Sequence, residues 1–173
     1  METKTLIECR ELKKSYGRKE ALRGVNLELG SGRIIGLLGP NGSGKTTLIK
    51  LMSGLLQPTS GEVRIGGFVP GVETKAMVSY LPDRPYFENW MRVKDTLDMF
   101  QDFYKDFDRP RAQVMCAALG IGEKDSVKAM SKGTREKLQL ILVMSRQAMV
   151  YLLDEPIAGV DPAARDYILK TIL

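Results

Sequence analysis

The chain has 173 residues, which is long enough for one domain with a hydrophobic core and too short for two full domains. Hydrophobic residues make up 43% and charged residues 27%, so the disordered and fibrous classes are excluded. The net charge of +5 is scattered without a basic block, which fits an ordinary solvated surface, while a nucleic acid, a nucleotide or a membrane face stays open as a partner.

The cysteines and the apolar runs bear on cellular location. Cys9 and Cys116 stand far apart, in neither a C-x-x-C nor a metal-ligand pattern, and are interpreted as reduced thiols of a cytosolic protein. The N-terminus METKTLIECREL is too polar for a signal peptide, and runs such as 148–153 are far shorter than the roughly 20 residues of a spanning helix. We therefore expect membrane association only through a partner.

The first elements in chain order are strands. Thr5–Glu11 and Ala21–Leu29 nearly alternate around a Tyr16-Gly17 loop, which predicts an antiparallel pair. Arg33–Leu38 is apolar after its first residue and predicts a short buried strand, followed by a Gly-rich loop and a helix over Thr46–Leu56. The apolar residues of that helix recur at helical spacing: Leu48, Leu51, Met52 and Leu55.

The middle of the chain changes from strands to helices. After a turn at 57–61, Glu62–Ile65 and Met77–Leu81 are further short strand candidates. Asn89–Leu119 is charged and helical in pattern, and we interpret it as a small helical insertion. Two apolar stripes are predicted in it, one of Val93, Leu97 and Phe100 and one of Val114, Ala117 and Ala118.

The last part of the chain repeats the order helix and strand. A buried helix face is predicted after the segment MSKGT, Met130–Thr134, on Leu138, Ile141, Leu142 and Ser145. Met149–Leu153 is an apolar strand that ends at Asp154 and Glu155. Apolar strands separated by helices predict a parallel, doubly wound sheet, with ligands beyond the carboxyl ends of the strands.

The Gly-rich loop GPNGSGKT, Gly39–Thr46, matches G-x-x-x-x-G-K-[ST] without a mismatch, between a predicted strand and a predicted helix. Glycines let backbone N–H groups curl toward phosphate oxygens, and Lys45 adds a positive charge for the outer phosphates. The Thr46 hydroxyl can ligate Mg²⁺, and the helix presents its positive end to the same anion. A tight turn without a ligand is the alternative.

The acidic strand end can supply the remaining chemistry. Asp154 could hold the magnesium shell and Glu155 could polarise an attacking water. A helix cap is the alternative for an Asp-Glu-Pro at a strand end, and the phosphate loop disfavours it.

This order of motifs resembles the nucleotide-binding domain of the ABC ATPases over the whole chain. The resemblance implies an α/β P-loop NTPase fold, with a mostly parallel sheet flanked by helices. It places an antiparallel β lobe at about 1–30, a RecA-like core at about 31–82 and 146–173, and a helical subdomain at about 83–145, all in one domain that is incomplete at its C-terminus. The implied nucleotide-binding residues are Tyr16, which would stack on adenine, Ala21, Gly39, Asn41, Gly42, Ser43, Gly44, Lys45, Thr46, Thr47, Ser131 and Gly133.

MSKGT aligns with the family signature LSGGQ, whose Ser and second Gly contact the γ-phosphate bound to the opposite subunit. Ser131 and Gly133 retain these positions, so the resemblance implies a dimer with ATP between the phosphate loop and the partner's signature. The segment 158–162, AGVDP, resembles the loop whose Asp, here Asp161, links the two sites. A simple helix cap by Ser131 is the alternative.

Several positions depart from the family pattern. In SYLPD, 79–83, Asp83 stands where the family has Gln, and we hypothesise a metal-side ligand there; Lys132 and Thr134 also differ from the signature. The chain has no histidine and stops at Leu173, within an expected helix after Asp161, so the family's switch His is absent. We expect a fragment of a longer chain, which binds nucleotide better than it hydrolyses it.

The resemblance implies the ATP-hydrolysing subunit of a membrane transporter, using ATP and Mg²⁺, with Glu155 as general base and Asp154, Thr46 and Asp83 as metal ligands. The partners expected are a second nucleotide-binding subunit and a membrane subunit, contacted by 83–91, on the cytoplasmic face of the membrane. The short insertion favours an exporter. A soluble ABC-type ATPase acting on nucleic acid or the ribosome is the alternative, disfavoured because no second phosphate loop or sustained heptad occurs.

Overall fold

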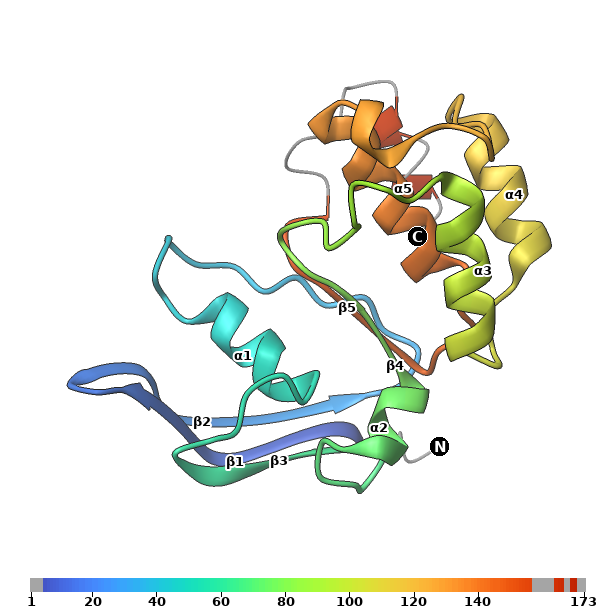
Figure 1. The fold of residues 1–173 in the computed structure, drawn as a ribbon. Helices are drawn as coiled ribbons and strands as arrows, with labels where there is room; N and C mark the ends of the chain where they lie inside the picture. The colour runs from blue at the N-terminus through green and yellow to red at the C-terminus, as the bar shows by residue number, and fades with distance from the viewer. Residues whose placement is uncertain (1–4, 157–163, 167–168, 171–173) are drawn as a thin grey trace. The chain divides into compact units, whose positions relative to one another are not determined.

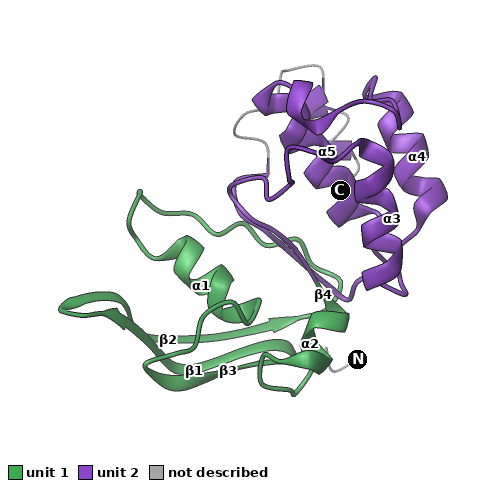
Figure 2. Cartoon of the chain, viewed as in Figure 1, with its two compact units in different colours: residues 1–78 green, residues 79–173 purple. Residues whose placement is uncertain are grey.

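The computed structural model describes residues 5–156, 164–166 and 169–170. The chain divides into two compact units, residues 1–78 and residues 79–173, coloured separately in Figure 2. Each unit has its own secondary structure and its own buried residues, and each is described in turn.

Unit 1 is built on an antiparallel sheet of three strands, β1 (Thr5–Tyr16), β2 (Lys19–Gly30) and β3 (Ser60–Ile65), in the order β2-β1-β3 (Figure 1). The long central strand β1 pairs with both neighbours, so that Cys9 lies opposite Leu27 on one side and Val63 on the other. The predicted antiparallel lobe is confirmed, and its strands are longer than the sequence pattern indicated.

Two helices complete unit 1. α1 (Lys45–Met52) turns its apolar stripe inward, and the buried members of that stripe are Leu48, Ile49, Leu51 and Met52. The helix ends before Leu55, which is exposed, so the prediction that Leu55 belongs to this stripe is wrong. α2 (Val72–Met77) was not predicted; it ends at Met77, and the expected strand begins one residue later.

The predicted strand over Arg33–Leu38 is not formed in the structure. A strand is held by hydrogen bonds to a neighbour, and neither sheet in the described residues contains this segment. Its apolar side chains are exposed, Ile34 at 64% and Leu38 at 92%. The segment therefore has the composition of a buried strand without the neighbour that would bury it.

Unit 2 pairs two short strands and covers them with helices. β4 (Val78–Leu81), which starts at the last residue of unit 1, is bonded to β5 (Val150–Leu153), and their carboxyl ends meet where the Asp154 N–H donates to the Leu81 carbonyl at 3.0 Å. The pair is therefore parallel, as predicted. The helical elements are α3 (Val93–Phe103), α4 (Arg109–Ala118), the 3₁₀ turn η1 (Val127–Ala129) and α5 (Lys132–Met144).

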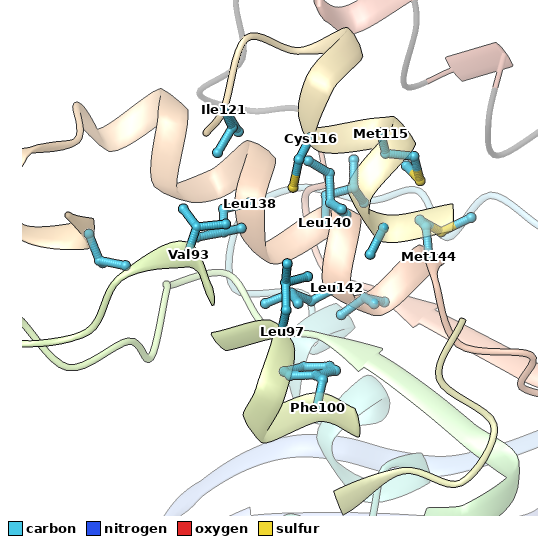
Figure 3. Packing of buried hydrophobic residues seen from close by; sticks show 14 of the residues in the cluster. Val93, Leu97, Phe100, Met115, Cys116, Ile121, Leu138, Leu140, Leu142 and Met144 are labelled. Atoms are coloured by element: carbon cyan, nitrogen blue, oxygen red, sulfur yellow. The ribbon is translucent and has the colours of Figure 1, made fainter. Parts of the chain in front are cut away.

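The core of unit 2 lies among α3, α4 and α5 (Figure 3). α3 contributes Val93, Leu97 and Phe100, which confirms the first predicted stripe. The second stripe is wrong, because α4 buries Ala112, Met115 and Cys116 and leaves Val114 68% exposed. The predicted face of α5 is confirmed: Leu138, Ile141, Leu142 and Ser145 have no exposed surface.

Among the described residues, no helix combines the length and the apolar character needed to cross a bilayer.

Candidate functional site

The phosphate-loop sequence of unit 1 leads directly into α1. The Ser43 N–H donates to the Pro40 carbonyl at 3.2 Å, which curls the loop. The Lys45 ammonium donates to the carbonyls of Gly39 at 2.8 Å and Pro40 at 3.0 Å, so its charge lies against the loop backbone. Because Lys45 is also the first residue of α1, a positive side chain and the positive end of a helix occupy the same place.

Glycine is required at two points of this loop. Gly44 precedes α1 with φ +96°, and a Cβ there would lie 2.6 Å from the Ala21 carbonyl of β2. A Cβ on Gly39 would lie 2.8 Å from the Ser43 hydroxyl. The loop is therefore closed in by the β2 backbone at Gly44, while Gly42 has open space around it, and a curled loop ahead of a helix fits a bound phosphate chain.

The other predicted nucleotide-binding residues of unit 1 lie near this loop or at the end of the central strand β1. Ala21 is the residue that Gly44 approaches, so these two predicted positions are brought together. Thr46 and Thr47 are half-buried in the first turn of α1, and Asn41 and Gly42 are exposed. Tyr16 ends β1 with 47% of its surface exposed, and the Lys14 ammonium lies 5.3 Å from the centre of its ring.

In unit 2 the predicted metal ligand Asp154 follows β5 directly. Asp154 is only 4% exposed, and its Oδ2 is buried without a hydrogen-bond partner among the described residues. A buried carboxylate oxygen in this condition is costly unless a cation or a donor reaches it, so the side chain fits a Mg²⁺ ligand. Within the described residues, no group of three or more Asp, Glu, Cys or His side chains could hold a metal ion.

Tyr80 lies close to this carboxylate and was not predicted. Its hydroxyl is also buried without a hydrogen-bond partner in the described structure. Burial, and then the negative charges of Asp154 and Asp83, raise the pKa of Tyr80 to about 12. Tyr80 is therefore a neutral hydroxyl at neutral pH and can donate to an acceptor placed beside it.

Glu155 and Asp83 line one cavity of about 90 Å³, together with Lys132, Glu136 and Gln139 of α5. Glu155 is exposed and has a φ of +50°, a left-handed conformation that is rare for a residue other than glycine. The two predicted acidic roles thus occupy different surroundings, one buried and one open to solvent.

Gln139 belongs to this cavity and was missed by the sequence analysis. It is 1% exposed, and its amide nitrogen donates to the Pro82 carbonyl at 3.3 Å, next to Asp83. The sequence signal was a polar residue inside the apolar stripe of α5, directly after Leu138. Helix α5 is thus connected to the segment that carries Asp83.

The signature segment forms the start of α5. Ser131 caps the helix, because its hydroxyl accepts from the Thr134 N–H at 3.1 Å, and the two hydroxyls lie 2.9 Å apart. Ser131 is exposed and Gly133 is half-buried. Lys132 faces Glu136 one turn later at 3.8 Å. The capping role of Ser131 is thus present in the structure. Asp161, the residue predicted to link the two sites of a dimer, lies outside the described residues.

The structure therefore gathers the predicted residues into two groups, the phosphate loop with Ala21 in unit 1 and the acidic strand end with Asp83 in unit 2. A glycine cradle ahead of a helix, with a buried aspartate at the end of a separate strand, defines a P-loop nucleotide-binding protein. The ABC transporter family model matches residues 22–158, and the chain belongs to this family. The family resemblance predicted from the motifs is confirmed.

The relatives agree with this assignment. The chain is 30% identical to the linearmycin resistance ATP-binding protein LnrL of Bacillus subtilis and 37% identical to the uncharacterised ABC transporter ATP-binding protein YdbJ of the same species. These alignments cover 96% and 91% of this chain but 56% and 54% of the relatives, so the chain spans about half of their length.

A solved ATP-binding subunit of an ABC transporter superposes with a TM-score of 0.87 at 26% identity, over 97% of this chain and 73% of that one. The predicted α/β P-loop fold class is thereby confirmed.

Proposed function

We propose that this chain is the ATP-binding and ATP-hydrolysing part of an ABC membrane transporter. The observation that carries the proposal is the position of Lys45, whose ammonium lies against the carbonyls of Gly39 and Pro40 at the start of α1. An ammonium and a helix N-terminus in one glycine cradle form a site for the phosphates of a nucleotide. Family membership supports ATP as that nucleotide.

Phosphate binding follows from the groups in the cradle. The Lys45 ammonium exchanges two neutral carbonyls for the β- and γ-phosphate oxygens, and hydrogen bonds to charged acceptors are stronger than those to carbonyls. The N–H groups at the start of α1, including those of Thr46 and Thr47, have no partner within the helix and donate to the same oxygens. The Gly42 N–H can supply a further backbone donor, while the Ser43 N–H would have to exchange the Pro40 carbonyl for a phosphate oxygen.

Asp154 and the Thr46 hydroxyl would hold Mg²⁺, and we propose Asp83 as a third oxygen ligand on the same side. Mg²⁺, when bound, neutralises charge on the phosphates. Asp154 suits this role because its buried Oδ2 lacks a partner in the described part of the chain.

Glu155 is proposed as the general base. It is exposed, so a water molecule can reach its carboxylate and lose a proton to it as the oxygen attacks the γ-phosphate. A buried residue such as Asp154 cannot serve in this way while it holds a cation.

Two chains are needed for the complete site in this proposal. Ser131 and Gly133 at the start of α5 would contact the γ-phosphate held by the partner chain, using the same exposed helix N-terminus that Ser131 caps. Asp161 would connect the two nucleotides. The dimer can be formed by two copies of this chain or by this chain and a related one.

The membrane partner is proposed to bind the segment 83–91. Trp90 is 74% exposed and Tyr86 45% exposed, with the rings of Tyr86 and Phe87 5.2 Å apart. Exposed aromatic groups of this kind are typical of interfaces. The chain would then lie on the cytoplasmic face of the membrane; export as the transport direction stays a prediction from the short helical insertion.

The test is ATP binding and hydrolysis by the wild-type chain and two variants. Lys45→Ala should weaken ATP binding more than about tenfold, because a charged hydrogen bond to phosphate is lost. Glu155→Gln should retain binding and lose about a hundredfold or more of the hydrolysis rate. Lys50→Ala, in the last turn of α1, is the control and should change neither quantity. Unchanged ATP binding in Lys45→Ala would overturn the proposal.

A further inference from the structure

Lys14 makes two contacts that the proposed nucleotide chemistry does not use. Its ammonium lies over the ring of Tyr16, 5.3 Å from the ring centre, and donates to the Gln57 carbonyl at 2.8 Å. Lys14 and Tyr16 are two positions apart on β1, so the strand presents both side chains to one side. A single cation thus contacts the aromatic ring and the turn that follows α1.

The neighbouring backbone reinforces this connection. The Ser15 N–H donates to the Thr59 hydroxyl at 3.0 Å, and the Thr59 N–H donates to the Lys13 carbonyl at 2.9 Å. The end of β1 is therefore attached at three points to the turn after α1, the helix that starts at the phosphate loop. Tyr16 and the phosphate loop are held in one framework within unit 1.

We propose that Lys14 is a positioning residue for the base of the nucleotide, one that holds the Tyr16 ring ready to stack on adenine. The proposal rests on the proposed ATP-binding function. The ammonium is attracted to the electron-rich face of the ring and occupies that face. Tyr16 is 47% exposed, which leaves side-chain surface that a flat base can cover.

The expected gain in ATP affinity comes from ordering of the Tyr16 ring before the nucleotide binds. A free surface tyrosine loses side-chain freedom when a base stacks on it, and a ring already held by a cation loses less. Lys14 itself is held by the Gln57 carbonyl, so its position does not depend on the nucleotide. Lys14 would thus affect binding of the base and not of the phosphates, which distinguishes this role from a general attraction between a lysine charge and the phosphates.

The experiment compares the affinities of ATP and tripolyphosphate by calorimetry for the wild-type chain, Lys14→Met and Lys13→Met. Methionine keeps the methylene stem and removes the charge. Lys13 is the matched control because it is an exposed neighbour on β1 that loses the same charge. Lys14→Met should weaken ATP binding about two- to fivefold, within the usual cost of ordering one free side chain on binding, and leave tripolyphosphate binding unchanged. Lys14→Arg should restore ATP affinity.

A double-mutant cycle separates positioning from simple packing. In the Tyr16→Leu background, Lys14→Met should have no further effect on ATP affinity, because the ring on which Lys14 acts is absent. Equal losses for ATP and tripolyphosphate, or a Lys14→Met effect that persists without the Tyr16 ring, would overturn the inference. Failure of the wild-type chain to bind either ligand would instead overturn the proposed function, so the two failures are distinguishable.

Discussion

The guanidinium of Arg146, 2% exposed, donates to both carboxylate oxygens of Asp106 at 3.1 Å and lies 3.9 Å from the centre of the Tyr104 ring. Tyr151, on β5, donates its hydroxyl to the Arg146 carbonyl. This network joins the segment between α3 and α4 to the strand that delivers Asp154 and Glu155. The strand that ends at the acidic pair is therefore connected to the ion pair of the buried Arg146.

Asp106→Ala should destabilise unit 2 by about 3 kcal/mol, because it removes the carboxylate that accepts two hydrogen bonds from the buried Arg146 guanidinium. Urea unfolding followed by circular dichroism measures this. Asp102→Ala removes an exposed carboxylate at the end of α3 and should cost less than about 0.5 kcal/mol. Equal effects of the two substitutions would show that the ion pair contributes nothing specific.

Gly44→Ala should destabilise unit 1 by about 3 kcal/mol in the absence of nucleotide, from left-handed strain and a collision with the Ala21 carbonyl. Gly42→Ala has a similar φ of +81° but open space around the new Cβ, and should cost only about 1 kcal/mol. Thermal unfolding of both variants compares them. If Gly42→Ala lowered the unfolding temperature more than Gly44→Ala, the close approach of Gly44 to β2 would not explain the need for glycine.

Cys9 and Cys116 should resist thiol reagents at pH 8 and react only on unfolding. Both are 2% exposed, and burial, with smaller contributions from Glu8 and Glu123 respectively, raises each thiol pKa to about 11. The folded state therefore holds these protons more tightly, so this contribution to stability is complete below about pH 9 and is lost as the pH rises toward 11. Since one thiol lies in each unit, labelling rates in urea report the opening of the two units separately. Fast labelling of either thiol in native buffer would contradict the burial of that cysteine.

Asp83→Ala should raise the Mg²⁺ concentration needed for half-maximal ATP hydrolysis about tenfold, because an oxygen ligand on the metal side is removed. Glu88→Ala, an exposed carboxylate in the same segment, serves as control and should leave the Mg²⁺ dependence unchanged. Unchanged Mg²⁺ dependence and rate in Asp83→Ala would remove Asp83 from the metal site.

Helix α3 could be predicted because its apolar residues fall on a single stripe, and Val93, Leu97 and Phe100 are all buried. The same reasoning failed on α4, where small and apolar residues occur all around the helix, so the buried side is decided by packing against α5. The segment 33–38 had the right composition for a buried strand, yet strand formation depends on a partner strand that a local pattern does not contain.

In the candidate site, too, some features could be predicted from the sequence and others could not. The loop over Gly39–Lys45 could be predicted from the spacing of its residues, because its glycines adopt backbone conformations that other residues rarely adopt. The contact of Gln139 with the Pro82 carbonyl joins residues distant in the sequence, and the left-handed backbone of Glu155 has no local signal. Such features arise from tertiary structure, so sequence periodicity could not predict them.

In the proposed mechanism two chains enclose ATP, and the mass of the Glu155→Gln chain in solution with saturating Mg-ATP tests this. We predict a dimer with Mg-ATP and a monomer without it, and a monomer under both conditions when Ser131→Arg is added, with ATP binding retained. A Glu155→Gln chain that binds Mg-ATP and stays monomeric, or a dimer that is indifferent to Ser131→Arg, would contradict the claim.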